Sequence, residues 1–180
     1  MGSFHRYLRP APLGQIVTSR FLLLFVLFLL LPRLLPVAAA DLSGRVTWIY
    51  DGDTIKVENI GKVRLVGIDA PEHKDSGRDS YYLRQGIRRA RLRQVSKEAL
   101  TFLIETVKGK YVTLETDNET RDRHGRRLAY VYLPDGTLLN QQLIAEGYAA
   151  VYRKFDFRMK QQFIATERTA QKNGLGLWQP

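Results

Sequence analysis

The chain has 180 residues and a formal net charge of +10, and it contains no cysteine. This length suits a single domain, and the excess of positive charge favours anionic partners such as nucleic acids or acidic membranes. Without cysteine, disulfides, thiol nucleophiles, iron–sulfur clusters and cysteine-ligated zinc are excluded. Only three histidines are present, so any metal must be held mainly by oxygen.

Residues 1–40 carry four arginines and no acidic residue, and they include an unbroken apolar run at residues 21–31. At about 1.5 Å per residue, this run covers about half of a hydrocarbon core. A basic start, a short apolar run and the small residues that end at Ala40 are typical of a secretory signal cleaved before Asp41. The alternative is a membrane anchor that extends to about Ala40.

Either interpretation places one domain, residues 41–180, outside the cytoplasm. The domain is then secreted or periplasmic after cleavage, or membrane-anchored if the segment is retained. A membrane partner is expected only in the second case, and we expect a monomer. Residues 41–180 carry 24 basic and 18 acidic side chains, so an anion-seeking surface remains after cleavage.

Strand patterns recur along the domain, with β-branched and aromatic residues bounded by turn signals. They predict five strands, at residues 44–50, 54–57, 62–68, 111–115 and 128–133. Mainly apolar positions at helical spacing predict a helix from residue 92 to residue 107, stopped at Gly109. Asn140 is expected to cap a short helix that ends at Gly147, and a last helix is expected at residues 159–172. Together these elements favour a small closed antiparallel barrel.

Carboxylates cluster at two of the predicted turns. Asp51 and Asp53 flank Gly52, and Asp69 and Glu72 follow the third strand. If the second and third strands pair, Asp53 and Asp69 meet at one rim of the barrel, where two carboxylates repel unless a cation lies between them. Oxygen ligands favour Ca²⁺ or Mg²⁺, and calcium suits an exported protein. Taken alone, the Asp51–Thr54 segment is also a common turn.

Two arginines lie near this rim. Arg64 precedes Asp69 by five residues, so strict alternation places them on opposite faces unless a bulge at Gly67 shifts the register. Arg126 ends a charged loop at residues 117–127, beside Gly125. For Arg64 the alternative is an exposed strand residue or a salt-bridge partner, and for Arg126 it is a solvated loop. A divalent cation with two guanidiniums suits a phosphodiester, whose hydrolysis adds negative charge to the phosphoryl oxygens. Motifs of serine hydrolases, P-loop NTPases and zinc proteases are absent.

Four blocks resemble the staphylococcal nuclease-like (thermonuclease) family. They are residues 51–54, 63–72, 122–130 and 139–149, and the resemblance extends from about residue 42 to residue 178. It implies an α+β fold dominated by a small β-barrel, an OB-fold of five strands with about three helices. It also implies Ca²⁺-dependent hydrolysis of phosphodiester bonds in DNA and RNA.

The resemblance also implies a role for each matching position. Asp53 and Asp69 are the expected side-chain ligands of calcium, with the backbone carbonyl of Ala70 as a third ligand. Glu72 is expected to orient or deprotonate the attacking water. The residues expected to bind the scissile phosphate are Arg64 and Arg126, and those expected to support the metal ligands are Asp51 and Thr54.

Substrate contacts are less closely matched to the family. His124 stands where the family often has tyrosine, and we expect it to contact substrate together with Arg123. Tyr152 is either a base-stacking residue or a core tyrosine. A basic stretch at residues 78–97 is longer than the family pattern, and we expect it to guide the polyanion; its candidate contacts are Arg88, Arg89, Arg91 and Arg93.

Two other functions fit parts of the sequence. A noncatalytic OB-fold module could bind nucleic acid by stacking and charge alone, but it would not need Arg64, Glu72 and Arg126 beside two metal carboxylates. A membrane-surface protein could use the basic stretch to bind anionic lipids. Packing of that stretch on the barrel explains its apolar positions better.

Overall fold

The computed structural model describes Gly2 and residues 42–180. The predicted signal or anchor segment, with the cleavage site before Asp41, lies outside the described residues apart from Gly2. Among the described helices, none has the length and apolar character to cross a membrane.

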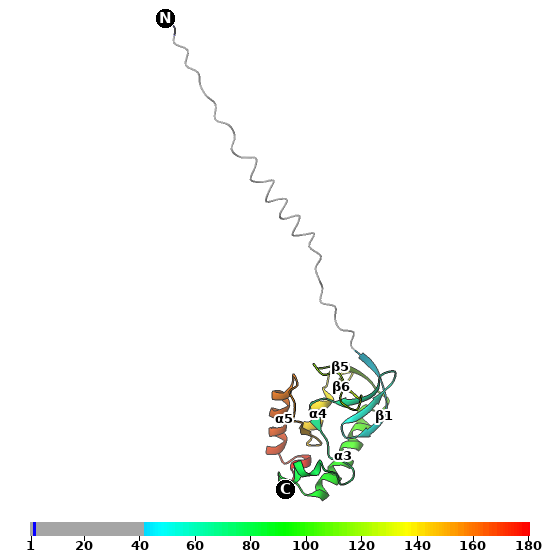
Figure 1. The fold of residues 1–180 in the computed structure, drawn as a ribbon, viewed down its shortest axis with the longest axis vertical. Helices are drawn as coiled ribbons and strands as arrows, with labels where there is room; N and C mark the ends of the chain where they lie inside the picture. Colours follow the sequence, from blue (N-terminus) through cyan, green and yellow to red (C-terminus); the bar gives the residue numbers. More distant parts are fainter. Residues whose placement is uncertain (1, 3–41) are drawn as a thin grey trace. The chain divides into compact units, whose positions relative to one another are not determined.

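Five strands form a closed barrel, which confirms the predicted architecture (Figure 1). Around the barrel the strand order is β1-β2-β3-β6-β5. The bounds are β1 Leu42–Asp51, β2 Thr54–Val57, β3 Gly61–Leu65, β5 Tyr111–Glu115 and β6 Arg127–Tyr132.

The prediction of a fully antiparallel barrel was wrong, because β3 and β6 pair in parallel. The other four pairings around the ring are antiparallel. A closed ring with an odd number of strands cannot alternate direction throughout, so at least one neighbouring pair must be parallel. Here it is the pair joined by the long connection through the helices.

The third predicted strand is divided at Gly67. β3 ends at Leu65, and the chain turns through Gly67, whose φ of 79° suits glycine. A Cβ atom at this position would lie 2.5 Å from the ring of Phe157. β4 (Ile68–Asp69) then pairs with β7 (Ala150–Val151) in a separate two-stranded sheet. A turn, rather than the predicted bulge, therefore breaks the side-chain alternation.

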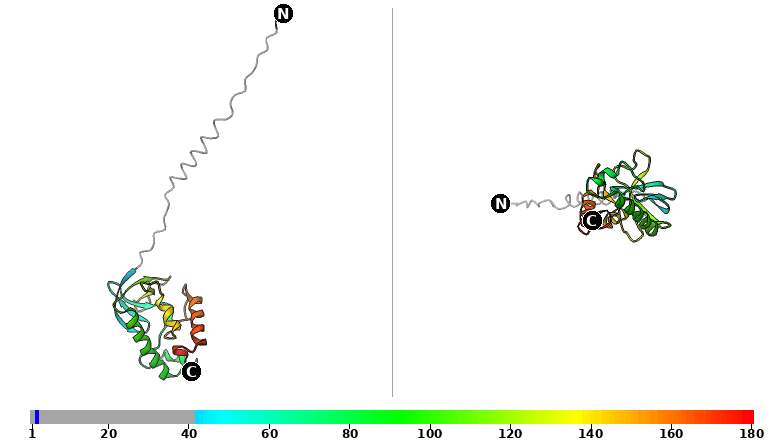
Figure 2. Two further views of the ribbon diagram at one scale, coloured as in Figure 1. Left: turned by 180° about the vertical axis from the view of Figure 1, so that it is seen from behind. Right: turned by 90° about the horizontal axis from the view of Figure 1, so that it is seen from below.

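Helices cover the barrel on more than one side (Figures 1 and 2). α3 (Arg89–Val107) packs on β1, while α4 (Leu139–Ala145) lies between β6 and α5 (Lys160–Lys172). The predicted stop of α3 at Gly109 is confirmed by its φ of 80°. Three short elements were not predicted: α2 (Asp79–Leu83), β7 and the 3₁₀ helix η1 (Gly176–Trp178).

Asn140 does not cap α4 as predicted, because it lies inside the helix and is fully buried. Its amide donates to the carbonyls of Val66, at 2.9 Å, and Ala129, at 3.2 Å. Its side-chain oxygen accepts from the amide of Val131 at 2.9 Å. Asn140 therefore ties the end of β3 to β6.

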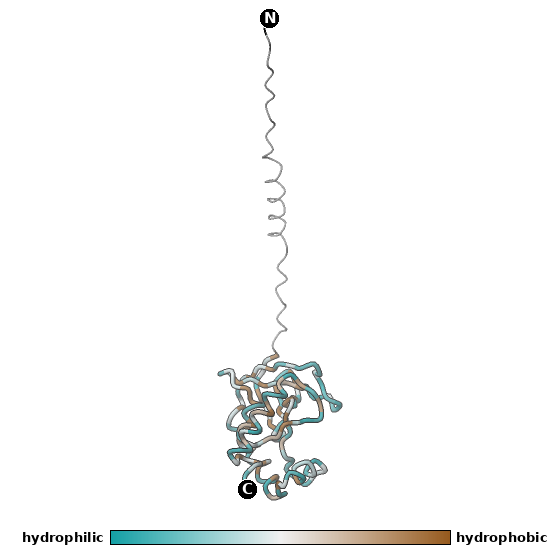
Figure 3. Tube along the Cα trace, turned by 90° about the vertical axis from the view of Figure 1, so that its left-hand side faces the viewer, coloured by the Kyte–Doolittle hydropathy of each residue, from teal (hydrophilic) through white to brown (hydrophobic). Residues whose placement is uncertain are grey.

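Apolar residues gather in the interior of the folded part, and hydrophilic residues dominate its outer loops (Figure 3). A second, smaller apolar cluster joins the basic stretch to the C-terminus. Its members are Tyr82, Ile87, Leu92, Val95, Ala150 and Leu177. The basic stretch is thus a folded part of the domain.

Candidate active site

The pairing of β2 with β3 brings the two predicted carboxylates to one rim. Thr54, the first residue of β2, lies opposite Arg64 near the end of β3. The preceding turn packs tightly on the site, since a Cβ atom at Gly52 would lie 2.7 Å from Cβ of Ala70. The Asp51–Asp53 turn is therefore pressed against the segment that carries Asp69 and Ala70.

Asp53 is buried and fixed by three neighbours. Its Oδ1 accepts from the hydroxyl of Thr54 at 3.0 Å, and its Oδ2 accepts from the amide of Ala70 at 2.9 Å. The amide of Asp53 donates to Oδ1 of Asp51 at 3.0 Å. Thr54 thus orients the carboxylate of Asp53, and Asp51 holds its backbone amide.

Arg64 lies between the two carboxylates and is only 7% exposed. Its Nη2 donates to Oδ1 of Asp69 at 3.1 Å and to the carbonyl of Ile68 at 3.0 Å, and its Nη1 forms an ion pair with Asp53. The turn at Gly67 has brought Arg64 and Asp69 to the same side, so the exposed-strand alternative for Arg64 is wrong, whereas its two ion pairs agree with the salt-bridge alternative. One guanidinium therefore neutralises two converging carboxylates.

Tyr82 is a support that the sequence analysis missed. It lies in α2, is fully buried, and its hydroxyl donates to the backbone carbonyl of Asp69 at 2.8 Å. Burial and the charge of Asp69 raise the pKa of Tyr82 well above its ordinary value, so the phenol remains a donor. Its apolar neighbours Tyr81 and Leu83 indicate only that this segment is buried, and no local motif marks the contact with Asp69.

Glu72 lies beyond β4 and is partly exposed. Nη1 of Arg78 donates to Oε1 of Glu72 at 2.8 Å and lies 3.5 Å from Oδ1 of Asp69. Arg78, which the sequence analysis did not select, therefore links Glu72 to the carboxylate cluster.

Arg126 reaches the same rim from the loop before β6. Its Nη1 donates to the hydroxyl of Thr54 at 3.3 Å, and its Nε donates to Oδ2 of Asp122 at 2.7 Å. Asp122 also accepts from the backbone amides of His124 and Arg126, so it holds the loop closed. The loop is thus tied to the site, which favours the site interpretation over a solvated charge run.

Burial and charge shift the pKa values of several groups here. Burial raises the pKa of Asp51, although Arg64, Thr54 and Arg126 oppose the shift. Burial lowers the pKa of Arg64, and the charge of Asp69 opposes that change. At Asp122 burial raises the pKa, but the hydrogen bonds from Arg126 and His124 and the charge of Arg126 together lower it below the ordinary value.

The predicted substrate contacts are distributed differently. Arg123 and His124 are exposed at the tip of the loop, where Nε of Arg123 lies 3.1 Å from Nε2 of His124. Tyr152 follows β7, and its amide donates to the carbonyl of Gly67 at 2.9 Å. Its half-buried ring packs on Phe155, with the ring centroids 5.2 Å apart. This position is beside the β4 strand, and both interpretations of Tyr152 stay open.

Three of the four selected arginines in the basic stretch are engaged within the protein. Asp79 accepts from Nη1 of Arg89 at 3.3 Å and from Nη2 of Arg93 at 2.6 Å. Nε of Arg91 donates to the carbonyl of Gly176 at 2.8 Å. Arg88 is exposed and precedes α3.

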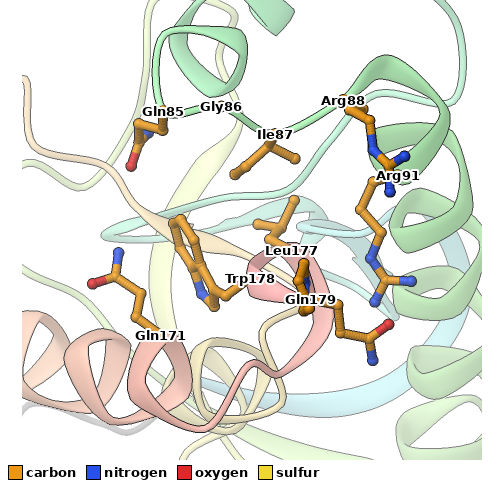
Figure 4. Close-up of a pocket in the computed structure, with 10 residues that line it drawn as sticks. Gln85, Gly86, Ile87, Arg88, Arg91, Gln171, Leu177, Trp178 and Gln179 are labelled. Carbon is orange, nitrogen blue, oxygen red and sulfur yellow. The ribbon is translucent and has the colours of Figure 1, made fainter.

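Arg88 and Arg91 line a cavity of about 320 Å³ against the C-terminus, which Figure 4 shows. Trp178 and Leu177 form its apolar side, and side-chain amides such as Gln85 lie at its edge. None of the carboxylates at the rim lines this cavity, so it is distinct from the candidate active site.

The rim has a donor set that fits a hard divalent cation. Asp53 and Asp69 converge on the guanidinium of Arg64, and Ala70, whose carbonyl is the third ligand that the resemblance implies, donates its amide to Asp53. Within residues 42–180, no group of three or more acidic or histidine side chains could hold a metal. A cation here would therefore depend on two carboxylates, a backbone carbonyl and water.

Comparison with known proteins agrees with this geometry. The model of the staphylococcal nuclease homologue family matches residues 62–180. The chain belongs to the staphylococcal nuclease family. The matched region covers β3 to the C-terminus and includes Arg64, Asp69, Glu72 and Arg126.

Individual members of the family match most of the chain. An uncharacterised protein of Methanocaldococcus jannaschii is 37% identical over 147 residues, covering 75% of this chain and 70% of that protein. An uncharacterised endonuclease of Escherichia coli O157:H7 is 38% identical over 144 residues, with 78% and 80% coverage. A thermonuclease of Staphylococcus hyicus is 29% identical over 144 residues and covers 78% of each chain.

Proposed function

We propose that this chain is an exported, calcium-dependent nuclease that hydrolyses phosphodiester bonds of DNA and RNA. Family membership and relatives named endonuclease and thermonuclease support phosphodiester hydrolysis. The observation that carries the proposal is the convergence of Asp53 and Asp69 on Arg64, with Arg126 joined to the same rim through Thr54. A module that only binds nucleic acid has no need of this arrangement.

Asp53, Asp69 and the Ala70 carbonyl are the proposed calcium ligands. When bound, Ca²⁺ supplies a positive charge to the phosphoryl oxygen and acidifies a bound water. Thr54 and the Ala70 amide hold Asp53 in place, and Tyr82 does the same for the backbone of Asp69. These contacts fix the ligands before substrate arrives, which is the condition for a well-ordered oxygen site.

Arg64 and Arg126 are the proposed donors to the scissile phosphate. A guanidinium has five N–H donors, and Nη2 of Arg64 uses two of them on Asp69 and Ile68, while Nη1 is ion-paired with Asp53. The remaining donors can bind a phosphoryl oxygen as negative charge develops on it. Asp122 orients Arg126 by accepting from its Nε, so the Nη groups of Arg126 lie at the rim.

Glu72 is the proposed general base for the attacking water. Its carboxylate is accessible, and Arg78 holds it near Asp69. A carboxylate within hydrogen-bond reach of the water could remove its proton as the new P–O bond forms.

The proposed export depends on the predicted N-terminal signal. The exported protein is expected to be a monomer. N-terminal sequencing of the protein recovered from an expressing cell tests this part. A mature chain that begins at Asp41 supports cleavage; an intact chain in the membrane fraction supports the anchor; and an intact chain in the cytoplasm contradicts export.

The activity is tested by incubating the purified protein with plasmid DNA or with RNA, in calcium or in EGTA. We expect degradation of both substrates in calcium and of neither in EGTA. Binding of DNA without degradation in calcium would instead identify a noncatalytic OB-fold module.

A further inference from the structure

β1 presents two exposed aromatic side chains on the outer wall of the barrel. Trp48 is 55% exposed and Tyr50 is 40% exposed, whereas Ile49 between them is buried in the core. Trp48 precedes the buried Ile49 and lies opposite the exposed Lys56, so it points to the outer face. Tyr50 lies in a register irregularity between Ile49 and Asp51, and the contact of its ring with Lys62 places it on the same face. Large exposed aromatic residues on a soluble domain are costly to leave in water and often mark a binding surface.

Lysines from two further strands and a loop surround these rings. Lys56 on β2 lies opposite Trp48, and Lys62 on β3 lies opposite Lys56. Nζ of Lys62 lies 4.4 Å from the ring centroid of Tyr50, and Nζ of Lys108 lies 5.6 Å from that of Trp48. Within residues 42–180, none of these three lysines forms a salt bridge. We call Trp48, Tyr50, Lys56, Lys62 and Lys108 the outer aromatic face.

This face continues directly into the candidate active site. Val63 points into the core, so its neighbours Lys62 and Arg64 share the opposite side of β3. On β2, Lys56 and Thr54 are likewise separated by the buried Ile55. The cross-strand pair Thr54–Arg64 and the pair Lys56–Lys62 are therefore consecutive on one side of the sheet, about 7 Å apart along the strands.

We propose that the outer aromatic face is a second binding site for single-stranded nucleic acid, contiguous with the active site. Bases stack on the rings of Trp48 and Tyr50, and the three ammonium groups contact the phosphates between them. Aromatic platforms flanked by cations bind single strands in this way, with little dependence on sequence. The inference rests on the proposed nuclease function, because that function makes nucleic acid the substrate that reaches the rim.

A membrane surface is the competing partner for exposed tryptophan, tyrosine and lysine. Two features favour nucleic acid. First, Lys62 and Lys108 lie over the rings of Tyr50 and Trp48, not only at the edge of the outer aromatic face. Second, this face lies on the same side of the sheet as Arg64.

The test uses the purified full-length protein in EGTA and measures its affinity for an oligothymidylate of about 20 nucleotides, longer than one OB-fold site. We expect Trp48→Leu and Tyr50→Leu to weaken binding roughly tenfold each, because each change removes one stacking platform. The conservative variants Trp48→Phe and Tyr50→Phe keep a ring and should bind within about threefold of the wild type. Lys56→Gln and Lys62→Gln should each lower the salt slope of binding by about 0.7, unlike the matched change Lys172→Gln on α5.

A chromogenic phosphodiester of one nucleotide, assayed in calcium, separates this inference from the proposed function. We expect the leucine variants to cleave it at the wild-type rate, because it is too short to reach the outer aromatic face.

Wild-type oligonucleotide affinity in both leucine variants would overturn the inference. So would loss of binding to phosphatidylserine vesicles without loss of oligonucleotide affinity, which would identify a membrane surface. If the wild type cleaves no phosphodiester, the proposed function fails, and the binding data still decide the face.

Discussion

The domain contains two clusters of arginine and aspartate, one centred on a buried guanidinium and the other on a buried carboxylate. At the rim, the single guanidinium of Arg64 contacts two carboxylates, Asp53 and Asp69. In the basic stretch, the single carboxylate of Asp79, which is 1% exposed, contacts Arg89 and Arg93. The first cluster has spare negative charge that can attract a metal ion. The second uses its charges to hold α2 against α3.

The comparison shows that a count of charges does not locate a binding site. The basic stretch carries seven basic side chains and one acidic one, yet two of its arginines are bound to Asp79 and a third to the carbonyl of Gly176. Charged side chains that are paired with other groups of the protein contribute to stability. Charged side chains that remain available to a ligand contribute to function. The two clusters should therefore respond differently to substitution.

The largest effect is expected at the rim. Arg64→Ala and Arg126→Ala should each lower the single-turnover rate of DNA cleavage by roughly 10²-fold or more, because each removes a preorganised donor to the transition state. Arg168→Ala is the matched control, since Arg168 is exposed on α5 and forms no ion pair within residues 42–180. Wild-type rates in both rim variants would refute the roles given to these arginines.

Glu72→Gln tests the proposed base at the same rim. The amide cannot accept the proton from water, so kcat should fall by about 10²-fold while KM changes little. Steady-state kinetics with a short DNA substrate measures both constants. A proportional loss of affinity would show instead that Glu72 serves mainly to hold Arg78.

The cluster at Asp79 should affect stability instead of chemistry. Asp79→Asn should lower the free energy of unfolding by about 2 kcal/mol, because it removes charge-assisted hydrogen bonds from a buried position. Urea denaturation measures this change, and cleavage of a one-nucleotide substrate should be unaffected. Asp75→Asn is the control, because Asp75 is exposed and lies 3.8 Å or more from the same arginines. Equal effects of the two changes would remove the distinction between the clusters.

The smallest effect is expected from the arginines of the basic stretch that have no partner among the described residues. Replacing Arg84 and Arg88 together with glutamine should reduce the salt slope of DNA binding by at most about two, one for each lost phosphate contact. Affinity measured over a series of salt concentrations gives the slope. An unchanged slope would show that the stretch does not guide the substrate.

The sequence was sufficient for the parts of the fold and site that depend on neighbouring elements. Pairing of β2 with β3 follows from their short connection, and it brings Asp53 and Asp69 together as predicted. The break at Gly67 could be anticipated because Arg64 and Asp69 otherwise face apart. The family motifs then identified the remaining candidate, Arg126, across a much longer separation.

Contacts set by distant packing could not be predicted in this way. Tyr82 reaches Asp69 only because α2 folds back on the rim, and nothing local signals that contact. Asn140 has the residue type of a helix cap, but burial between β3 and β6 gives it three backbone partners instead. A closed ring of the five predicted strands requires at least one parallel pair, but the choice of β3 and β6 follows from the strand order around the ring, which a list of strands does not contain.

Calcium titration by calorimetry tests most directly whether the rim holds the metal ion. We expect the wild type to bind Ca²⁺ at one site, and Asp53→Asn and Asp69→Asn each to abolish measurable binding together with DNA cleavage. Asp135→Asn, in an exposed turn outside the rim, should change neither. Undiminished calcium binding in both rim variants would contradict the account.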